Sequence, residues 1–431
     1  MPERDAIGVV GLGYVGLPLA IAFARTGRKV VGFDPDGDKV AAINAGRSYI
    51  RHIPAAAVKM IRAAGGSASA ESRPLAGAGA ILICVPTPLT RNRNPDLCHV
   101  EAAADLVAGI LRPGQLVCLE STTYPGTTRE IVLPRLEKSG LRAGRDFFLA
   151  YSPEREDPGS AGRSANDIPK VVGGLTPACL AAARRIYDLA APCTVPVSSL
   201  EAAEASKLME NIFRCVNIAL VNELKQVFSR MGIDVWEVIE AAKSKPFGFM
   251  PFYPGPGLGG HCIPIDPFYL AWKAREHECA TRFIELAGEV NLAMPEYVVN
   301  RTVEELNRIR KSLKGSRILV IGLAYKKNVD DVRESPSLRL LELFDRGGAK
   351  VAYHDPLVPA MPPGHFEGGL SRLRSLPFTP ARLSRFDAVV VATDHDAVDY
   401  RLLARHAALV VDVRNAMARS GAKGGARVAK A

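Results

Sequence analysis

The sequence has neither the long apolar runs of a membrane protein nor the leader of a secreted one. None of its hydrophobic runs reaches the ~18 to 20 uninterrupted apolar residues that are needed to span a bilayer. Residues Met1 to Asp5 lead directly into an apolar, strand-like run and lack the charged and then apolar plan of a signal peptide. We therefore expect a cytoplasmic protein with no membrane partner.

Paired cysteines are also missing. The eight cysteines include no Cys-x-x-Cys pair, which argues against a zinc site and against a disulfide framework, so we expect no metal. Cys84 and Cys118 lie inside apolar runs and are predicted to be buried as small hydrophobic residues. Cys262 differs, because glycines and prolines surround it instead of a core-like segment.

A concentrated basic region is absent from most of the chain, although the net charge is +10. The basic residues are dispersed, and the one biased stretch is residues 418–431, which is rich in Ala, Gly, Lys and Arg and is predicted to be a disordered tail. We expect no nucleic-acid partner. A basic surface would equally suit an anionic small substrate, so charge alone does not identify the partner.

The composition that is present, 48% hydrophobic and 23% charged, is ordinary for an α/β protein. Strand-like runs alternate with helical patterns in the first part of the chain, which predicts a doubly wound parallel sheet in a domain that covers residues 1–197. The runs lie at residues 6–10, 28–34, 80–85, 116–120, 147–151 and 170–173.

From about Leu200 the apolar spacing becomes helical, and residues 198–312 are predicted to form a central helical domain with an oligomer contact. It should contain one long helix over 201–231, a second over 234–242, and helices from 266 to about 311 that Pro295 breaks or kinks. Runs at 316–322, 350–354, 388–393 and 408–413 predict a second sheet over 313–417. The expected fold class is α/β, with two Rossmann-like domains joined by the helical one.

A glycine pattern follows the first predicted strand. Gly11, Gly13 and Gly16 are spaced as Gly-x-Gly-x-x-Gly and enclose Tyr14 and Val15. In a dinucleotide turn these glycines allow the tight bend, the approach of the pyrophosphate and close helix packing. Asp34 ends the next strand, where a carboxylate binds the ribose hydroxyls, and no arginine adjoins it. The pattern therefore predicts NAD rather than NADP, against the alternative of a purely structural turn.

Two further loops follow strands at the edge where open α/β sheets bind ligands. Pro86 and Thr87 come after the run at 80–85, and Thr122 comes after the run at 116–120. Each loop taken alone could be an ordinary turn. Together with the glycine pattern they are predicted to line the cofactor.

Cys262 is the candidate nucleophile. A thiol held in a glycine-rich loop beside a redox cofactor indicates oxidation of an alcohol past the aldehyde, because the thiol can capture the aldehyde and carry it on as a thioester. Asp266, four residues later, supplies a carboxylate within reach. The neighbouring His261 can be read equally as a general base or as a structural residue.

Three other candidate residues can also be interpreted as ordinary surface residues. Glu154 belongs to a charged run after a strand, and such a run is usually a solvated loop. Lys207 and Asn211 are four residues apart and share one helix face with Glu204, and spacing alone favours a surface arrangement for them.

Taken together, these motifs resemble the UDP-sugar 6-dehydrogenase family of NAD-dependent, four-electron oxidoreductases. The resemblance extends to about residue 415. It rests on the glycine fingerprint with Leu17-Pro18, Ser152-Pro153-Glu154, Lys207 and Asn211, Gly259-Gly260-His261-Cys262 with Asp266, and Lys326-Lys327 through Asp331-Val332-Arg333-Glu334-Ser335.

Within that family the chain looks most like the UDP-N-acetylglucosamine 6-dehydrogenases, which supply polysaccharide and lipopolysaccharide precursors. His261 and Ile265 stand where UDP-glucose dehydrogenases typically have serine and lysine. UDP-N-acetylmannosamine dehydrogenases share this pattern, so that substrate and UDP-glucose stay open, as does a non-catalytic NAD- or UDP-sugar-binding protein.

The resemblance implies a role for each motif. Lys207, Asn211 and a water held by Asp266 would stabilise the alkoxide and take its proton, Cys262 would form the thiohemiacetal and thioester, and Glu154 or Asp266 would activate water. Arg333 would reach the cofactor. The UDP-sugar would contact Phe252, Tyr253, Gly259, Lys326 and Arg414. A homodimer or higher homo-oligomer is expected.

Overall fold

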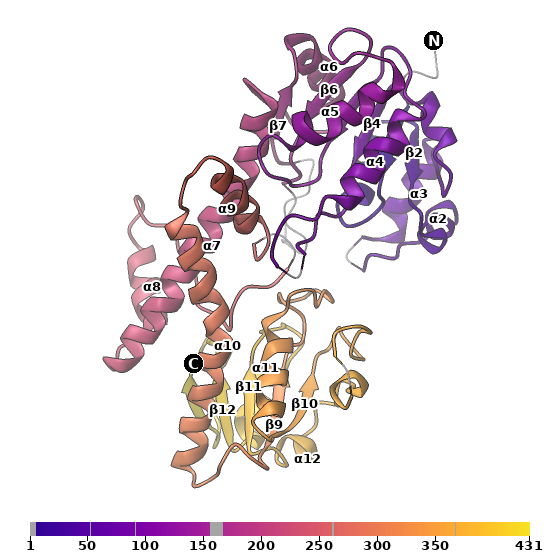
Figure 1. Cartoon of the computed structure of the whole chain (residues 1–431). Coiled ribbons are helices and arrows are strands. Elements are labelled where there is room, and N and C mark those ends of the chain that lie inside the picture. The colour runs from indigo at the N-terminus through magenta and orange to yellow at the C-terminus, as the bar shows by residue number, and fades with distance from the viewer. Residues whose placement is uncertain (1–5, 52, 91, 156–166, 261–262, 367) are drawn as a thin grey trace. The chain divides into compact units, whose positions relative to one another are not determined.

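The computed structural model describes the whole chain except residues 1–5, 52, 91, 156–166, 261–262 and 367 (Figure 1). His261 and Cys262 therefore lie outside the described residues. The described chain forms two compact units. Unit 1 contains Met1–Asn211 and Phe268–Ala280, and unit 2 contains Ile212–Pro267 and Thr281–Ala431.

Unit 1 is built on an eight-stranded sheet. Its strands are β1 (Ile7–Val10), β2 (Val30–Phe33), β3 (Ser67–Ser69), β4 (Ala80–Ile83), β5 (Leu116–Leu119), β6 (Phe148–Tyr151), β7 (Lys170–Gly174) and β8 (Thr194–Val197), in the order β3-β2-β1-β4-β5-β6-β7-β8. Its helices are α1 (Gly16–Arg25), α2 (Gly37–Asn44), α3 (Ala55–Ala63), α4 (Cys98–Ala108), α5 (Leu133–Leu136), α6 (Pro177–Tyr187), the start of α7 (Leu200–Arg230) and most of α9 (Asp266–Glu276).

The central strands of this sheet are buried on both faces, which explains why they read as continuous apolar runs. In β4, Leu82 packs into the core formed with α1, α3 and α6, while Ile81 and Ile83 pack into the core formed with α4 and α5. Cys84 and Cys118 are buried, as predicted. The α/β fold class predicted from the sequence is confirmed.

The predicted parallel sense is wrong for β7. Strands β1 to β6 are parallel, but β7 pairs with β6 antiparallel, and β8 runs parallel to β7. The first residue of β7, Lys170, therefore lies at the edge where β5 and β6 end. A parallel β7 would have placed it at the opposite edge.

Unit 2 contains a five-stranded, fully parallel sheet with the order β10-β9-β11-β12-β13. The strands are β9 (Arg317–Ile321), β10 (Lys350–His354), β11 (Ala388–Val391), β12 (Leu409–Asp412) and β13 (Arg427–Lys430). The helices are the rest of α7, α8 (Val235–Lys243), α10 (Arg282–Arg308), α11 (Pro336–Arg346), α12 (Pro380–Leu383), α13 (Tyr400–His406) and α14 (Ala416–Arg419).

The long central helix is confirmed, since α7 runs without interruption for 31 residues. Of the predicted break or kink at Pro295, the break is not found, because α10 continues across this residue. The interruption between α9 and α10 lies at residues 277–281. Proline cannot donate to the carbonyl four residues earlier, that of Asn291. A Cβ on Gly257 would lie 3.2 Å from this Asn291 oxygen, so the glycine-rich loop packs against the carbonyl that Pro295 leaves free.

The prediction of a disordered tail over 418–431 is wrong for its last residues. Residues 427–430 form β13, which pairs in parallel with β12. Arg427 bonds to Glu305 of α10 at 2.9 Å, and Lys430 bonds to Asp234, the residue before α8, at 2.5 Å. The free edge of β12 and these two carboxylates order a segment whose composition alone indicates disorder.

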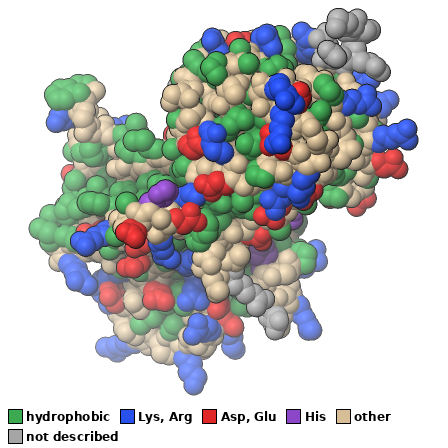
Figure 2. All heavy atoms as spheres, turned by 45° about the horizontal axis from the view of Figure 1, so that its top comes forward, with side chains coloured by type: hydrophobic (Ala, Val, Ile, Leu, Met, Phe, Trp, Pro, Cys, Tyr) green, Lys and Arg blue, Asp and Glu red, His purple; other side chains and the backbone are tan. Residues whose placement is uncertain are grey.

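Two surface properties bear on the expected partners. Among the described residues, no helix combines the length and the apolarity that crossing a membrane requires. On the face shown in Figure 2, Lys and Arg side chains are interspersed with Asp and Glu side chains and do not gather into one basic area.

Candidate functional site

The glycine turn after β1 is closed by packing on one side and open on the other. A Cβ on Gly16 would lie 1.8 Å from the Gly11 carbonyl oxygen, so only glycine lets α1 begin this close to the turn. A Cβ on Gly13 would meet nothing within 4 Å. The open space at Gly13, next to the first turn of α1, fits a pyrophosphate.

Asp34 lies directly after β2, and its side chain is hydrogen-bonded to this turn. Its carboxylate accepts hydrogen bonds from the backbone N–H of Leu12 at 2.9 Å and of Asp36 at 3.0 Å. Lys39 of α2, which the sequence reasoning did not single out, places its Nζ 3.3 Å from both oxygens. The half-buried Tyr14 and Val15 complete the turn between Gly13 and Gly16.

The two other predicted cofactor loops lie side by side. Ser121 donates a hydrogen bond from its Oγ to the carbonyl of Val85 at 2.7 Å, which joins the loop after β5 to the loop after β4. Pro86, Thr87 and Thr122 are therefore at neighbouring strand ends, and the backbone of Cys84 contacts the Gly11 turn. These residues fit an NAD site along the carboxyl edge of β1, β4 and β5.

Glu154 follows β6 at the same edge and belongs to a buried charge group rather than to a solvated loop. Its Oε2 is 3.1 Å from the Nζ of Lys170, which is also 2.5 Å from Oε2 of Glu120. Burial raises the pKa of Glu120. Burial alone would lower the pKa of Lys170, but the two carboxylates raise it above its usual range. Sequence reasoning missed Lys170 because it read β7 as parallel.

Lys207 and Asn211 lie on α7, and both are only 8% exposed. The surface interpretation of their spacing is therefore wrong. One turn earlier, the buried carboxylate of Glu204 accepts hydrogen bonds from the backbone N–H groups of Gly126 and Thr128 at 2.6 and 2.8 Å. This face of α7 is thus bound to the loop that also carries Thr122.

In unit 2 the glycine-rich loop packs against the turn after β9. A Cβ on Gly259 would lie 2.5 Å from the Cβ of Tyr325, the residue before Lys326. Gly260 donates its backbone N–H to the carbonyl of Arg333 at 3.0 Å. The structure therefore brings Gly259, Lys326 and Arg333 into one region, where the Arg333 guanidinium pairs with Asp331.

Arg414 contacts the same glycine-rich loop. Its Nη1 donates to the carbonyl of Pro254 at 3.4 Å, and its Nε donates to Asp394 at 3.2 Å. The other oxygen of Asp394 pairs with Arg419. Asp394, which sequence reasoning did not single out, thus holds both guanidinium groups.

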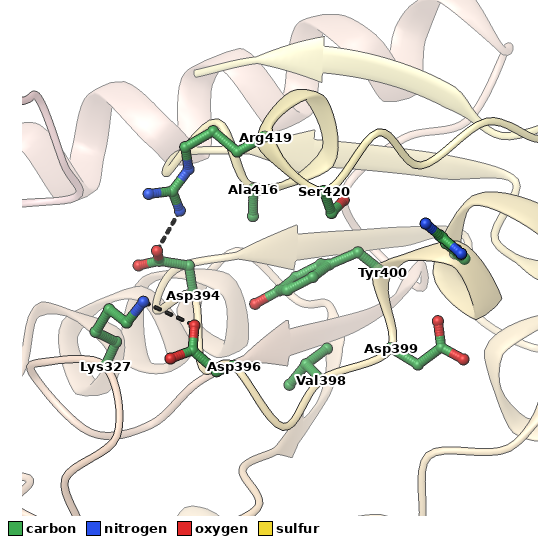
Figure 3. A pocket seen from close by; sticks show the side chains of 10 residues that line it. Lys327, Asp394, Asp396, Val398, Asp399, Tyr400, Ala416, Arg419 and Ser420 are labelled. Atoms are coloured by element: carbon green, nitrogen blue, oxygen red, sulfur yellow. Dashed lines mark hydrogen bonds and ion pairs between the residues drawn. The ribbon is translucent and has the colours of Figure 1, made fainter.

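Asp394 also lines a cavity of about 400 Å³ in unit 2 (Figure 3). Side chains from the loops after β9, β11 and β12 face this cavity, and Lys327 pairs there with Asp396 at 2.7 Å. The lining has a balanced formal charge, because three basic side chains (Lys327, Arg401 and Arg419) are matched by three carboxylates (Asp394, Asp396 and Asp399). Burial raises the pKa of the neighbouring Asp412, which accepts hydrogen bonds from the backbone N–H of Arg414 and from those of Ala416 and Met417 in the first turn of α14.

The remaining candidates have clear positions. Tyr253 stacks on Trp236 with ring centroids 5.5 Å apart, and its hydroxyl donates to Glu240 at 2.7 Å. Phe252 contacts Phe213 edge to face. Asp266 is buried as the first residue of α9.

Two sets of predicted residues are therefore assembled. In unit 1 they are the Gly11–Gly16 turn, Asp34, the two cofactor loops and Glu154, with Lys207 and Asn211 on α7. In unit 2 they are Gly259, Lys326, Arg333 and Arg414, with Phe252 and Tyr253 beside α7 and α8.

Comparison with family models covers most of the chain. The models of the UDP-glucose/GDP-mannose dehydrogenase family match residues 5–191 as the NAD binding domain, 201–293 as the central domain and 319–419 as the UDP binding domain. β13 lies beyond the last match.

The similar proteins are named for different N-acetylhexosamine substrates. The chain is 37% identical over 391 residues to the UDP-N-acetyl-D-glucosamine 6-dehydrogenase of Pseudomonas aeruginosa, covering 90% of each chain. It is 37% identical over 403 residues to the NDP-N-acetyl-D-galactosaminuronic acid dehydrogenase of Ralstonia nicotianae, again covering 90% of each. The solved structure of the UDP-D-ManNAc dehydrogenase of Pyrococcus horikoshii matches with a TM-score of 0.86 and 32% identity, covering 95% of this chain and 96% of that one.

Proposed function

The chain belongs to the UDP-glucose/GDP-mannose dehydrogenase family and is an NAD-dependent UDP-sugar dehydrogenase. We propose that it oxidises the C6 hydroxyl of UDP-N-acetylglucosamine to the uronic acid. The observation that carries the catalytic part of this proposal is the burial of Lys207 and Asn211 on one face of α7. Burying an ammonium is costly unless it is bonded, so a substrate alkoxide is a fitting partner for the Lys207 ammonium.

Each step of the proposed reaction is assigned to particular residues of the chain. Bound NAD supplies the hydride acceptor for each of the two oxidations. Lys207 and Asn211 stabilise the alkoxide that forms when the C6 hydroxyl loses its proton to a water held by Asp266. Cys262 adds to the aldehyde as a thiohemiacetal, and the second oxidation converts this adduct into a thioester. Glu154 then activates the water that releases the carboxylate.

The substrate is bound by residues of unit 2. Lys326 and Arg414 supply cationic groups for the UDP phosphates, and Gly259 keeps the glycine-rich loop close to the turn that carries Lys326. Phe252 and Tyr253 directly precede Pro254 in the chain, at the start of the glycine-rich loop. Arg333 is proposed to reach the cofactor.

The N-acetylhexosamine part of the proposal rests on His261 and Ile265, which replace the serine and lysine typical of UDP-glucose enzymes. An NADH assay with UDP-GlcNAc, UDP-ManNAc, UDP-GalNAc and UDP-glucose, run side by side, tests it. We expect the highest kcat/KM with UDP-GlcNAc and two NADH per sugar acid. A higher value with another sugar changes the named substrate, and one NADH per sugar refutes the four-electron reaction.

The thiol is tested separately. Cys262→Ser should abolish acid formation while the affinity for NAD stays within about twofold, because the thiol is needed only for the covalent steps. Steady-state acid production by this variant would contradict the thioester route. Lost NAD binding would show instead that the substitution disturbs the fold.

Self-association is also proposed. Leu220 and Val227 of α7 and Phe283, Leu286 and Leu292 of α10 are all more than two-fifths exposed. Apolar side chains on the helices of one unit favour contact with a second copy of the chain. Light scattering after size-exclusion chromatography should give at least twice the 46.2 kDa chain mass, and Leu220→Glu with Leu286→Glu should reduce it.

A further inference from the structure

Unit 1 contains a buried ammonium with two carboxylates at the edge where β5 and β6 end. Lys170 lies between Glu120, at 2.5 Å, and Glu154, at 3.1 Å. The second oxygen of Glu120 accepts a hydrogen bond from the hydroxyl of Tyr187, which also lies near Sγ of Cys118 at 3.1 Å. The group therefore contains two carboxylates for one ammonium.

The antiparallel register of β7 produces this arrangement. Ala150 faces Gly174 and Tyr151 faces Gly173, so each step forward on β6 corresponds to one step back on β7. Three steps beyond Tyr151 bring Glu154 opposite Lys170. The pairing between these two residues therefore follows from the sheet and does not depend on a flexible surface contact.

The two carboxylates have different environments. Glu120 has no exposed side-chain surface, whereas the Glu154 side chain is 12% exposed. Glu154 is also held by its other oxygen, which accepts the backbone N–H of Arg155 at 2.7 Å. Arg155 in turn bonds to the carbonyl of Pro169 and to Glu210. Glu154 is thus the member of the group that is oriented and still accessible.

We propose that Lys170 is a positioning residue for Glu154, orienting its carboxylate and keeping it ionised, while Glu120 holds Lys170 in place. This inference rests on the proposed function, in which Glu154 removes a proton from water. The water oxygen bonds to the thioester carbon, the C–S bond breaks, and sulfur leaves as thiolate. Glu154 carries the water proton and releases it to solvent.

Electrostatics predicts the direction in which each substitution should shift the pH dependence of thioester hydrolysis. Among the described residues, the charged or titratable groups around Glu154 are Lys170 of β7, Glu120 and Cys118 at β5, Cys84 after β4, Tyr187 of α6, and Arg155 with its partner Glu210 of α7. A nearby cation lowers the pKa of a carboxyl and a nearby anion raises it. Removing the charge of Lys170 should therefore shift the acid limb of thioester hydrolysis to higher pH, and removing that of Glu120 should shift it to lower pH.

The test uses the full chain with NAD and UDP-N-acetylglucosamine, or whichever of the four UDP-sugars produces NADH. Rapid mixing follows the NADH formed per site, and intact-mass measurement after acid quenching detects the acylated protein. The variants are Lys170→Met, Lys170→Arg, Glu120→Gln, the double variant Lys170→Met with Glu120→Gln, and Glu154→Gln as the reference.

Lys273→Met is the matched control. Its side chain is 10% exposed, as that of Lys170 is, and it contacts two carboxylates of the same unit, Glu130 and Glu276, each at 2.8 Å. The double variant separates a folding defect from a catalytic one, because it leaves no unpaired Glu120 charge in the interior.

We expect Lys170→Met and the double variant to form two NADH per site rapidly and then to accumulate acylated protein, with hydrolysis about 100-fold slower. Lys170→Arg should restore hydrolysis to within about tenfold of the unaltered chain, and Lys273→Met should match that chain. The acid limbs of Lys170→Met and Glu120→Gln should move in opposite directions.

Hydrolysis at the unaltered rate in Lys170→Met, or acid limbs that move together, would overturn the role of Lys170. A different pattern refutes the underlying function. If the unaltered chain forms one NADH per sugar, or if Glu154→Gln accumulates no acylated protein, the assigned chemistry of Glu154 is wrong whatever Lys170 does.

Discussion

The first βα turns of the two sheets share one geometry and differ in what they leave open. In unit 1, the carboxylate after β2, Asp34, binds the turn through the N–H of Leu12. In unit 2, the carboxylate after β10, Asp355, binds the turn through the N–H groups of Leu323 and Ala324 at 2.7 and 3.0 Å. Both acids hold the same kind of turn in place.

The partners of the two acids decide which turn can take a dinucleotide. Besides the backbone N–H of Asp36, Asp34 bonds to Lys39, whose side chain is 33% exposed and can be displaced. Asp355 instead bonds to the fully buried His395 at 3.1 Å and to two further backbone N–H groups. Ala324 of the second turn is also fully buried, whereas Gly13 of the first faces open space. The same fold thus binds NAD in one unit and seals the equivalent position in the other.

The largest expected effect comes from Asp355→Asn. An amide nitrogen would then face backbone N–H groups that now donate to the carboxylate, leaving buried donors unsatisfied. We expect the free energy of unfolding of unit 2 to fall by about 3 to 5 kcal/mol. Hydrogen exchange of β9 and β10 should accelerate, while the Kd for NAD should not change. The matched change Asp34→Asn should weaken NAD about tenfold with little loss of stability, and the reverse pattern would contradict the comparison.

The next effect is a pH dependence of opposite sign in the two units. Burial raises the pKa of Glu204 in unit 1 to about 7 from 4.5. A raised carboxyl pKa gives stability that is complete below about pH 4.5 and is lost as the pH rises through 7, by up to about 3 kcal/mol. Glu204→Gln should remove this decline in denaturant titrations between pH 5 and 8.

The contribution of Asp355 to stability should change with pH in the opposite direction. Burial alone would raise its pKa, but His395 and the backbone N–H groups lower it below 3.8. Its contribution is therefore present above pH 3.8 and is lost in acid. Unit 2 peptides should lose exchange protection as the pH falls below 4, and unchanged protection there would argue against this assignment.

Filling the open space at Gly13 should act on binding alone. Gly13→Val would place methyl groups where the pyrophosphate is expected, so the Kd for NAD should rise by about 100-fold or more while the melting temperature is nearly unchanged. The equivalent change in the second turn, Ala324→Val, should lower stability by about 1 to 3 kcal/mol and leave the Kd for NAD unaltered. Equal NAD affinity in both variants would contradict a site at the first turn.

The smallest effect concerns Lys39. In the Lys39→Met variant no cation has to leave Asp34 when NAD binds, so the Kd for NAD should fall. Because a partly exposed ion pair contributes at most about 1 kcal/mol, the decrease in Kd should be no more than about fivefold. Calorimetric titration of NAD measures this change. Weaker binding would show that Lys39 contacts the cofactor instead of competing with it.

Much of the fold was readable from local pattern. Apolar runs buried on both faces gave the predicted strands, and the glycine spacing with Asp34 gave the cofactor turn. The assignment of Lys207 and Asn211 needed the family resemblance, because spacing alone favoured the surface. The same face of α7 contacts, through Glu204, a loop about 80 residues earlier in the chain, and no local window contains both segments.

Two of the wrong predictions have related causes. β7 was read as parallel, and residues 427–430 were read as disordered. In both segments the local sequence is compatible with several outcomes, and a neighbouring strand decides between them. β6 sets the sense of β7, and the edge of β12, with Glu305 and Asp234, orders β13.

The sequence by itself determined the α/β class, the NAD turn and the order of the family motifs, because these depend on residues close together in the chain. Only the tertiary structure decided which charges meet. Lys170 reaches Glu120 and Glu154, and Asp394 reaches Arg414 and Arg419, through the packing of strands and loops. An ion pair between distant residues leaves no periodicity in the sequence, since its partners are chosen by strand direction and register.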